Sequence, residues 1–155
     1  MRRKKEYFEQ FPGEPAPLSV TVSHRVRFSE VDAMAIVWHG RYLEFFEKAH
    51  TELMRRAGLE YPAYRERNLA APVVQSHVDY FRPLRLDEVI AIEARLFWCE
   101  GARLNVAYRI TGADGATAAS GFTVQMFVDG ATRAPCMVEP DLIAEVKERW
   151  RKGLL

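Results

Sequence analysis

The sequence predicts an α+β fold in which one long helix lies across a meandering antiparallel sheet. Two observations lead to this prediction. A helical pattern with an apolar, aromatic-rich face ends at Ala57, and Gly58 follows where a left-handed C-cap is expected. Segments with a period of two, separated by turn residues, make up most of the remaining chain and indicate half-buried strands. The length of 155 residues suits one domain, which we place at residues 18–155.

Residues 1–17 are expected to form an N-terminal arm. The arm begins with a basic cluster at residues 1–5 and continues into a Pro-rich segment at residues 11–17. This composition favours a flexible, solvated tail over a contact with RNA or membrane.

The overall composition indicates a globular protein that does not bind nucleic acid through bulk charge. Lys and Arg number 22 against 21 Asp and Glu, so the formal net charge is only +1. No apolar run is long enough to span a membrane, and no apolar segment of a secretory signal follows the basic start. Cys99 and Cys136 are expected to be reduced. We therefore expect a cytoplasmic enzyme or binding protein.

The elements follow from the chain in order. A first strand is expected from Leu18 to Phe28, then the long helix, then a short helix or turn between Glu60 and Ala70. A terminal helix opens at Glu139, with Pro140 at a tolerated first-turn position. Four further strands and a short last one are expected, at residues 71–81, 90–98, 104–110, 118–128 and 133–137.

The candidate site is the loop that leads into the long helix. Asp32 follows the first strand, residues 33–38 are unusually apolar for a loop, and the helix is expected to start near His39 and Gly40. A carboxylate beside free helix N–H groups offers a base or nucleophile together with an oxyanion donor, which are the requirements of acyl transfer. The alternatives are that Asp32 caps a turn and that His39 is a general base, an N-cap or a surface residue.

Other site types find little support. His24, His50 and His77 lack the spacing of a metal site. No Gly-rich phosphate loop and no Gly-x-Ser-x-Gly nucleophile elbow occurs in the sequence. Arg82, Arg85 and Arg103 could meet phosphates, but solvated strand-end arginines are the favoured interpretation.

Two motifs resemble those of one known family. Residues 28–47 read FSEVDAMAIVWHGRYLEFFE and residues 78–88 read VDYFRPLRLDE. Together they are similar to the signatures of hot-dog fold thioesterases of the 4-hydroxybenzoyl-CoA thioesterase type, including the Tol-Pal-associated acyl-CoA thioesterases. The likeness covers roughly residues 20–143.

The resemblance implies a thioesterase that hydrolyses an acyl-CoA or acyl-carrier-protein thioester without a metal or other cofactor. It implies that Asp32 acts as nucleophile or general base and that the His39 backbone N–H polarises the thioester carbonyl. It places four residues near the acyl thioester: Val37, Trp38, Gly40 and Tyr42. It also implies a homodimer or homotetramer with active sites between subunits, which agrees with the exposed edge strand that a meander leaves.

The chain departs from the family pattern at two places. Ala35 stands where the family usually has Gly, so a positive φ there would strain the loop. The turn at residues 98–103 lacks a basic cluster that some members use for the phosphates of CoA, which leaves room for an acyl carrier protein. A non-catalytic acyl-thioester binding protein is therefore an alternative function, and a hot-dog hydratase or dehydratase ranks below it.

Overall fold

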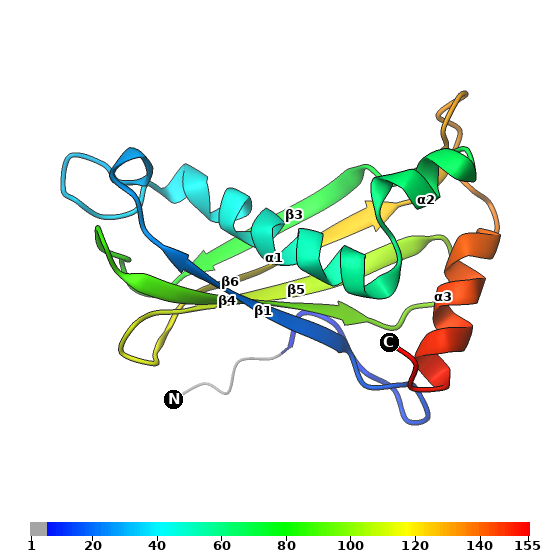
Figure 1. The fold of residues 1–155 in the computed structure, drawn as a ribbon, viewed down its shortest axis with the longest axis horizontal. Coiled ribbons are helices and arrows are strands. Elements are labelled where there is room, and N and C mark those ends of the chain that lie inside the picture. The colour runs from blue at the N-terminus through cyan, green and yellow to red at the C-terminus, as the bar shows by residue number, and fades with distance from the viewer. Residues whose placement is uncertain (1–5) are drawn as a thin grey trace.

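The computed structural model describes residues 6–155 as one antiparallel sheet with a long helix across one face (Figure 1). The helix α1 lies over the middle of the sheet, and α3 stands at one end of it (Figure 1). The elements in chain order are β1 (Leu18–Arg25), α1 (Tyr42–Ala57), α2 (Tyr61–Glu66), β2 (Leu69–Ala70), β3 (Val73–Tyr80), β4 (Val89–Phe97), β5 (Arg103–Thr111), β6 (Thr117–Met126), β7 (Val128–Asp129) and α3 (Asp141–Arg151).

The main sheet has five strands in the order β1-β4-β5-β6-β3, and each neighbouring pair is antiparallel. In the register Val22 faces Ile92, and Ile92 faces Ile110. The strands β1 and β3 are the two edges. A separate two-stranded ribbon joins β2 to β7.

The long helix packs its apolar face on the sheet, as predicted. Phe46 stacks on Tyr108 of β5 with ring centroids 4.5 Å apart. This close approach requires Gly121 on β6, because an added Cβ would come within 2.1 Å of the His77 carbonyl oxygen and 2.7 Å of the Phe46 ring. Gly58 ends the helix with φ +76°, which confirms the predicted C-cap. None of the helices within residues 6–155 is both long and apolar enough to cross a lipid bilayer.

Three boundaries differ from the predictions. The first strand ends at Arg25 because Phe28–Glu30 turns into a 3-10 helix. The short strand expected at residues 133–137 is only an isolated bridge of Pro135 with Val128, because the Asp129 carboxylate caps the turn that follows it. Pro140 occupies the N-cap of α3 rather than its first turn.

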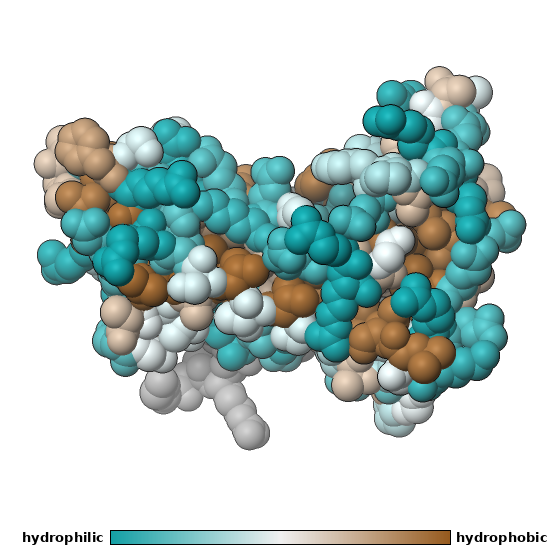
Figure 2. Space-filling model, viewed as in Figure 1, coloured by the Kyte–Doolittle hydropathy of each residue, from teal (hydrophilic) through white to brown (hydrophobic). Residues whose placement is uncertain are grey.

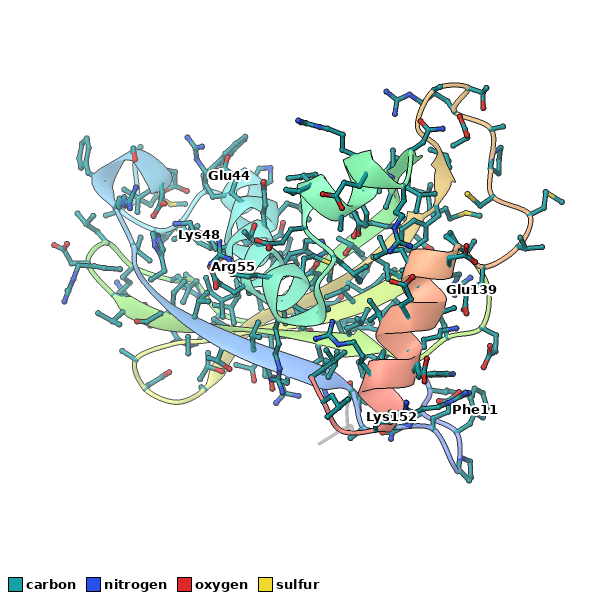
Figure 3. All side chains as sticks on the ribbon, turned by 45° about the vertical axis from the view of Figure 1, so that its right-hand side comes forward. Phe11, Glu44, Lys48, Arg55, Glu139 and Lys152 are labelled. Atoms are coloured by element: carbon teal, nitrogen blue, oxygen red, sulfur yellow. The ribbon has the colours of Figure 1, made fainter. Side chains whose placement is uncertain are left out.

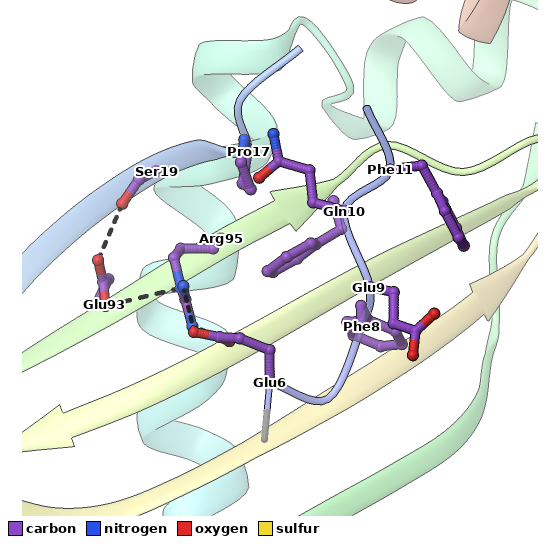
Figure 4. A pocket seen from close by; sticks show the side chains of 10 residues that line it. Glu6, Phe8, Glu9, Gln10, Phe11, Pro17, Ser19, Glu93 and Arg95 are labelled. Carbon is purple, nitrogen blue, oxygen red and sulfur yellow. Dashed lines mark hydrogen bonds and ion pairs between the residues drawn. The ribbon is translucent and has the colours of Figure 1, made fainter. Parts of the chain in front are cut away.

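The described part of the N-terminal arm packs on the sheet face opposite α1 (Figure 4). Phe8 contacts the rings of Phe97 and Phe122, with centroids 5.7 and 5.5 Å apart. Tyr7 donates a hydrogen bond to Asp79. Tyr7 and Phe8 are therefore not part of the solvated tail expected from composition, because their rings cover apolar groups of the sheet, whereas residues 9–13 are exposed. The basic cluster at residues 1–5 lies outside the described residues.

Candidate active site

The loop after β1 folds back on itself as a small hairpin at one end of the sheet. Val31 and Val37 form a bridge, and Asp32 N–H donates to Ile36 O at 2.8 Å. The hairpin is also fixed to the loop between β3 and β4, because Val37 N–H donates to Leu84 O at 2.8 Å. The apolar loop predicted from the sequence is therefore a braced structure rather than a free segment.

Asp32 is half-buried near the tip of this hairpin. Its Oδ1 accepts a hydrogen bond from Met34 N–H at 2.8 Å, which is the turn-capping role that the sequence left open. Among residues 6–155 no hydrogen bond to Oδ2 is formed. One carboxylate oxygen thus holds the turn, and the other is available to a substrate or water.

Ala35 adopts the left-handed conformation, with φ +58°. Its N–H donates to Asp32 O at 3.0 Å, which closes the turn at the hairpin tip. The sequence predicted strain at Ala35 if its φ were positive, and φ is positive. Residues with a Cβ are disfavoured in this conformation, whereas glycine adopts it freely.

The helix start presents free backbone donors. A 3-10 helix, His39–Arg41, leads into α1, and within residues 6–155 the N–H groups of His39 and Gly40 donate no backbone hydrogen bond. Tyr80, the last residue of β3, donates from its hydroxyl to His39 O at 2.9 Å. A Cβ at Gly40 would come within 2.2 Å of the Trp38 ring, so a larger residue there would displace the exposed Trp38 side chain.

The His39 imidazole is exposed and lies beside the Trp38 ring, with centroids 5.0 Å apart. Among the described residues it forms no hydrogen bond with Asp32. Within residues 6–155 the His39 side chain and Asp32 therefore form no pair, while the backbone N–H of His39 is free.

The predicted substrate residues divide into two groups. Trp38 and Gly40 are exposed, whereas Val37 and Tyr42 are buried and support the loop from below. Phe28 and Met34 are also strongly exposed, and Figure 2 shows hydrophobic surface at the end of the molecule where this loop lies. An apolar surface of this kind next to a carboxylate suits an apolar acyl group or a second subunit.

A buried charge cluster supports the base of the loop. Glu30 binds His24 through Oε2 and Nε2 at 2.8 Å. The Nζ of Lys48, which is labelled on α1 in Figure 3, lies 2.9 Å from His24 Nδ1. Burial alone would raise the pKa of Glu30, but hydrogen bonds from Arg27 N–H and His24 and the charge of Lys48 hold that pKa below its usual value. Trp38 N–H donates to Glu30 O at 3.0 Å, so the cluster fixes the segment before His39.

The sequence interpretation missed this cluster. The available signal was the position of His24 on the inward face of the first strand, where its neighbours of the same parity are apolar. A polar residue on a core face requires a buried partner, and that partner lies six residues along the chain.

A cavity of about 380 Å³, which we call the α1 cavity, lies between α1 and the strands β3, β5 and β6. His50 Nδ1 and the Tyr108 hydroxyl lie 2.8 Å apart in its wall. Burial lowers the pKa of His50 to about 4, so the ring is neutral at physiological pH. The residues lining it are Leu43, Phe46, Glu47, His50, Tyr61, Val73, Ser76, Tyr108, Thr123 and Gln125.

Comparison with protein families adds an independent observation. The family model of the thioesterase-like superfamily matches residues 26–146. This match includes the Asp32 loop, all of α1 and the five-stranded sheet apart from β1.

Individual relatives are thioester hydrolases. An acyl-CoA thioester hydrolase, YbgC, of Escherichia coli O6:H1 is 27% identical over 124 residues, covering 80% of this chain and 92% of the relative. A 1,4-dihydroxy-2-naphthoyl-CoA hydrolase of Synechococcus is 29% identical over 114 residues, covering 70% of this chain and 86% of the relative.

Solved structures confirm the predicted hot-dog fold. A DHNA-CoA thioesterase from Staphylococcus aureus superposes with a TM-score of 0.73 at 21% identity, covering 88% of this chain and 96% of that one. A hypothetical protein from Staphylococcus aureus, solved in complex with CoA, gives a TM-score of 0.77 at 16% identity and covers 94% of this chain and 90% of that one.

Proposed function

Because the chain belongs to the thioesterase-like superfamily, as its motifs predicted, we propose that it hydrolyses an acyl-CoA or acyl-carrier-protein thioester to a free acid and a thiol. The observation that carries this proposal is the pairing of Asp32, with one free carboxylate oxygen, and the unbonded N–H groups of His39 and Gly40 at the start of a helix. The acyl-CoA hydrolases among its relatives support CoA as the thiol carrier.

The reaction needs one base and one oxyanion site. In the general-base route, Asp32 takes a proton from water while the water oxygen forms a bond to the thioester carbonyl carbon. The His39 and Gly40 N–H groups stabilise the negative oxygen, and one such donor contributes about 3 kcal/mol in acyl transfer. The tetrahedral intermediate then breaks its C–S bond, and the thiolate recovers the proton from Asp32. In the alternative route, the Asp32 oxygen attacks the carbonyl carbon, the C–S bond breaks and the thiolate leaves, and water then hydrolyses the resulting anhydride to release the acid and restore Asp32.

We further propose a homodimer that joins two sheets along β3. The β3 edge carries exposed apolar side chains, with Val73 56% and Val74 54% exposed. The other edge, β1, is partly occupied because Arg56 donates to Ser19 O. An unpaired edge with apolar side chains is a template for pairing with another copy. A homotetramer built from two such dimers is compatible with this arrangement.

Pairing along the full length of β3 completes the site. An antiparallel two-fold pairing centred on His77, with Val74 as the bulged extra residue of β3, sets Val73 opposite the partner subunit's Tyr80. Val73 lines the α1 cavity and Tyr80 holds His39, so the α1 cavity of one subunit would adjoin the Asp32 loop of the other. The acyl group would then occupy the α1 cavity while the loop of the partner hydrolyses it.

The test is Asp32→Asn, assayed on short, long and aromatic acyl-CoAs. Asn retains the oxygen that caps the Met34 N–H, so the fold should persist, while hydrolysis should fall about 10²–10⁴-fold because the base is lost. Asp141→Asn, which changes an exposed carboxylate in α3, is the matched control and should keep wild-type turnover. Near-normal turnover by Asp32→Asn would exclude the proposed role.

The two other functions remain separable by experiment. The left-handed Ala35 is accommodated in an intact hairpin, so it does not argue for a non-catalytic binding protein. Such a protein would bind acyl-CoA tightly and hydrolyse none of the panel. A hydratase or dehydratase would change the absorbance of an enoyl thioester without releasing thiol. A cytoplasmic location stays a prediction.

A further inference from the structure

A second cavity, of about 510 Å³, opens between α2 and the β2–β7 ribbon, and we call it the α2 cavity. It lies outside the Asp32 loop and has no part in the chemistry proposed above. Its lining residues are Tyr61, Tyr64, Arg65, Asn68, Leu69, Ala70, Ala71, Gln125, Gly130 and Arg133.

Two buried polar atoms without partners belong to residues that line the α2 cavity. Within residues 6–155 three buried side-chain atoms make no hydrogen bond, and two of these are Tyr64 Oη and Gln125 Oε1. Gln125 Nε2 donates to Ala71 O at 2.7 Å, which fixes the amide so that Oε1 is the free acceptor. The third atom, Arg82 Nε, belongs to a guanidinium that already binds Glu88 and Asp114. Buried polar groups are normally paired, so a free acceptor and a free hydroxyl at one cavity indicate a polar ligand.

The hydroxyl is available as a donor. Tyr64 is 8% exposed, and burial raises its pKa well above the ordinary value, so it remains protonated at any physiological pH. Its ring packs edge-on against Phe127, with centroids 5.8 Å apart, which fixes the direction of the hydroxyl. A ligand carbonyl that reached this buried group would accept a hydrogen bond from it and satisfy it.

Two guanidinium groups border the same cavity. Arg65 and Arg133 form no ion pair within residues 6–155, whereas the neighbouring Arg67 is paired with Glu145. Asp129, the nearby acid on the ribbon, is occupied by Asn68 and by the turn that it caps. Unpaired guanidinium groups at a cavity rim suit a phosphate, which they can bind through two hydrogen bonds.

The α2 cavity adjoins the α1 cavity. Tyr61 and Gln125 line both of them, and Gln125 lies opposite Val73 in the sheet register. A ligand with its charged end at Arg65 and Arg133 could therefore extend past Gln125 to the β3 edge, where the partner's Asp32 loop is proposed to lie.

We propose that the α2 cavity binds the tail of coenzyme A. The amide groups of the pantetheine arm donate to Gln125 Oε1 and accept from Tyr64 Oη, and the phosphates lie against Arg65 and Arg133. This subsite rests on the proposed function, because it names where the thiol carrier of that reaction is held. It also accounts for the weakly basic turn at residues 98–103, since the phosphate contacts come from α2 and the loop after β7.

Binding of the unreactive carriers tests the proposal without hydrolysis. Calorimetry would measure the affinity for CoA, and ligand-observed NMR would measure the affinity for pantetheine, which should bind more weakly. The double variant Arg65→Gln/Arg133→Gln should bind CoA at least tenfold more weakly and bind pantetheine as the wild type does, because only CoA carries the phosphates. The matched control Arg103→Gln/Arg109→Gln removes two arginines from β5 and should leave CoA binding unchanged.

Tyr64→Phe tests the pantetheine contacts. It removes only a hydroxyl that has no partner within residues 6–155, so thermal stability should not fall, yet affinity should drop several-fold for both CoA and pantetheine. A merely structural role for Tyr64 would lower stability and leave affinity unchanged.

The outcomes separate this inference from the proposed function. Wild-type CoA affinity in the Arg65/Arg133 variant, loss of CoA binding in the Arg103/Arg109 control, or no CoA binding by the wild type would each overturn the subsite. If CoA binding depends on Arg65 and Arg133 but no acyl-CoA is hydrolysed, the subsite stands and the proposed hydrolysis fails.

Discussion

The Tyr80 hydroxyl donates a hydrogen bond to the His39 carbonyl at 2.9 Å. This bond ties the last residue of an edge strand to the first residue of the 3-10 helix that leads into α1. Tyr80 also packs edge-on against Tyr42, with ring centroids 4.8 Å apart, so its position is set by the core beneath the loop. The orientation of the His39 N–H group is therefore linked to the strand that we propose pairs in the dimer.

The first prediction follows from this bond. Tyr80→Phe keeps the ring and removes the hydroxyl, which should lower kcat about fivefold, the equivalent of roughly 1 kcal/mol for one hydrogen bond. Tyr7→Phe, which removes a hydroxyl bound to Asp79 on the opposite sheet face, should leave kcat unchanged. Steady-state kinetics of both variants would measure the difference, and equal effects would show that the bond does not position His39.

Replacing Ala35 with glycine should stabilise the protein. Ala35→Gly removes the Cβ from a residue with φ +58° and so relieves backbone strain. Glycine also makes the unfolded chain more flexible, which opposes folding, but the net free energy of unfolding should still rise by about 0.5–1 kcal/mol. The midpoint of thermal unfolding should rise by about 2–4 °C. Ala33→Gly, in the same loop but without a positive φ, should lower the midpoint. A lower midpoint for Ala35→Gly would show that strain at this residue is negligible.

Glu30 should make stability depend on pH. Its pKa is lowered in the folded state, so its ionised form stabilises the fold above the unfolded-state pKa, and that stabilisation is lost as pH falls through the folded pKa. Glu30→Gln should therefore reduce the free energy of unfolding by about 3 kcal/mol at pH 7, because His24 and Lys48 lose a buried partner.

The difference in the free energy of unfolding between the wild type and Glu30→Gln should vanish at a pH below the folded-state pKa of Glu30, because the wild-type carboxyl is then itself neutral. Urea unfolding at a series of pH values would measure it. Glu148→Gln, which removes an exposed partner of Lys152, is the control and should change stability little at any pH. A difference for Glu30→Gln that is the same at pH 7 and at acid pH would contradict the electrostatic role of the cluster.

The proposed β3 pairing predicts opposite effects for two charges at one position. In the full-length register the exposed Gln75 lies opposite the partner subunit's Asp79. Gln75→Asp should repel that carboxylate and shift the protein toward monomer, whereas Gln75→Lys should keep the dimer. Sedimentation velocity at micromolar concentration would measure the oligomeric state, and the monomer should also lose hydrolysis. Identical behaviour of the two variants would exclude this register.

Local sequence patterns determined most of the elements. The apolar face of α1, the C-cap at Gly58 and the period-two strands follow from properties of neighbouring residues, so they could be predicted without the fold. The same is true of Asp32 and His39 as a candidate pair, since both lie in one short segment at a helix start. The family motif also singled out Ala35, and the structure shows that its φ is positive.

Contacts between distant segments were decided only by the tertiary structure. The packing of Phe8 on Phe122, the pairing of β2 with β7 and the meeting of Tyr64 with Gln125 at one cavity join residues that are far apart in the chain. Such contacts form because folding brings particular faces together, and periodicity records only that a face is apolar or polar, not what covers it. The sequence alone therefore determined where the candidate site lies along the chain, and the tertiary structure determined which groups brace that site and which cavity we propose for the carrier.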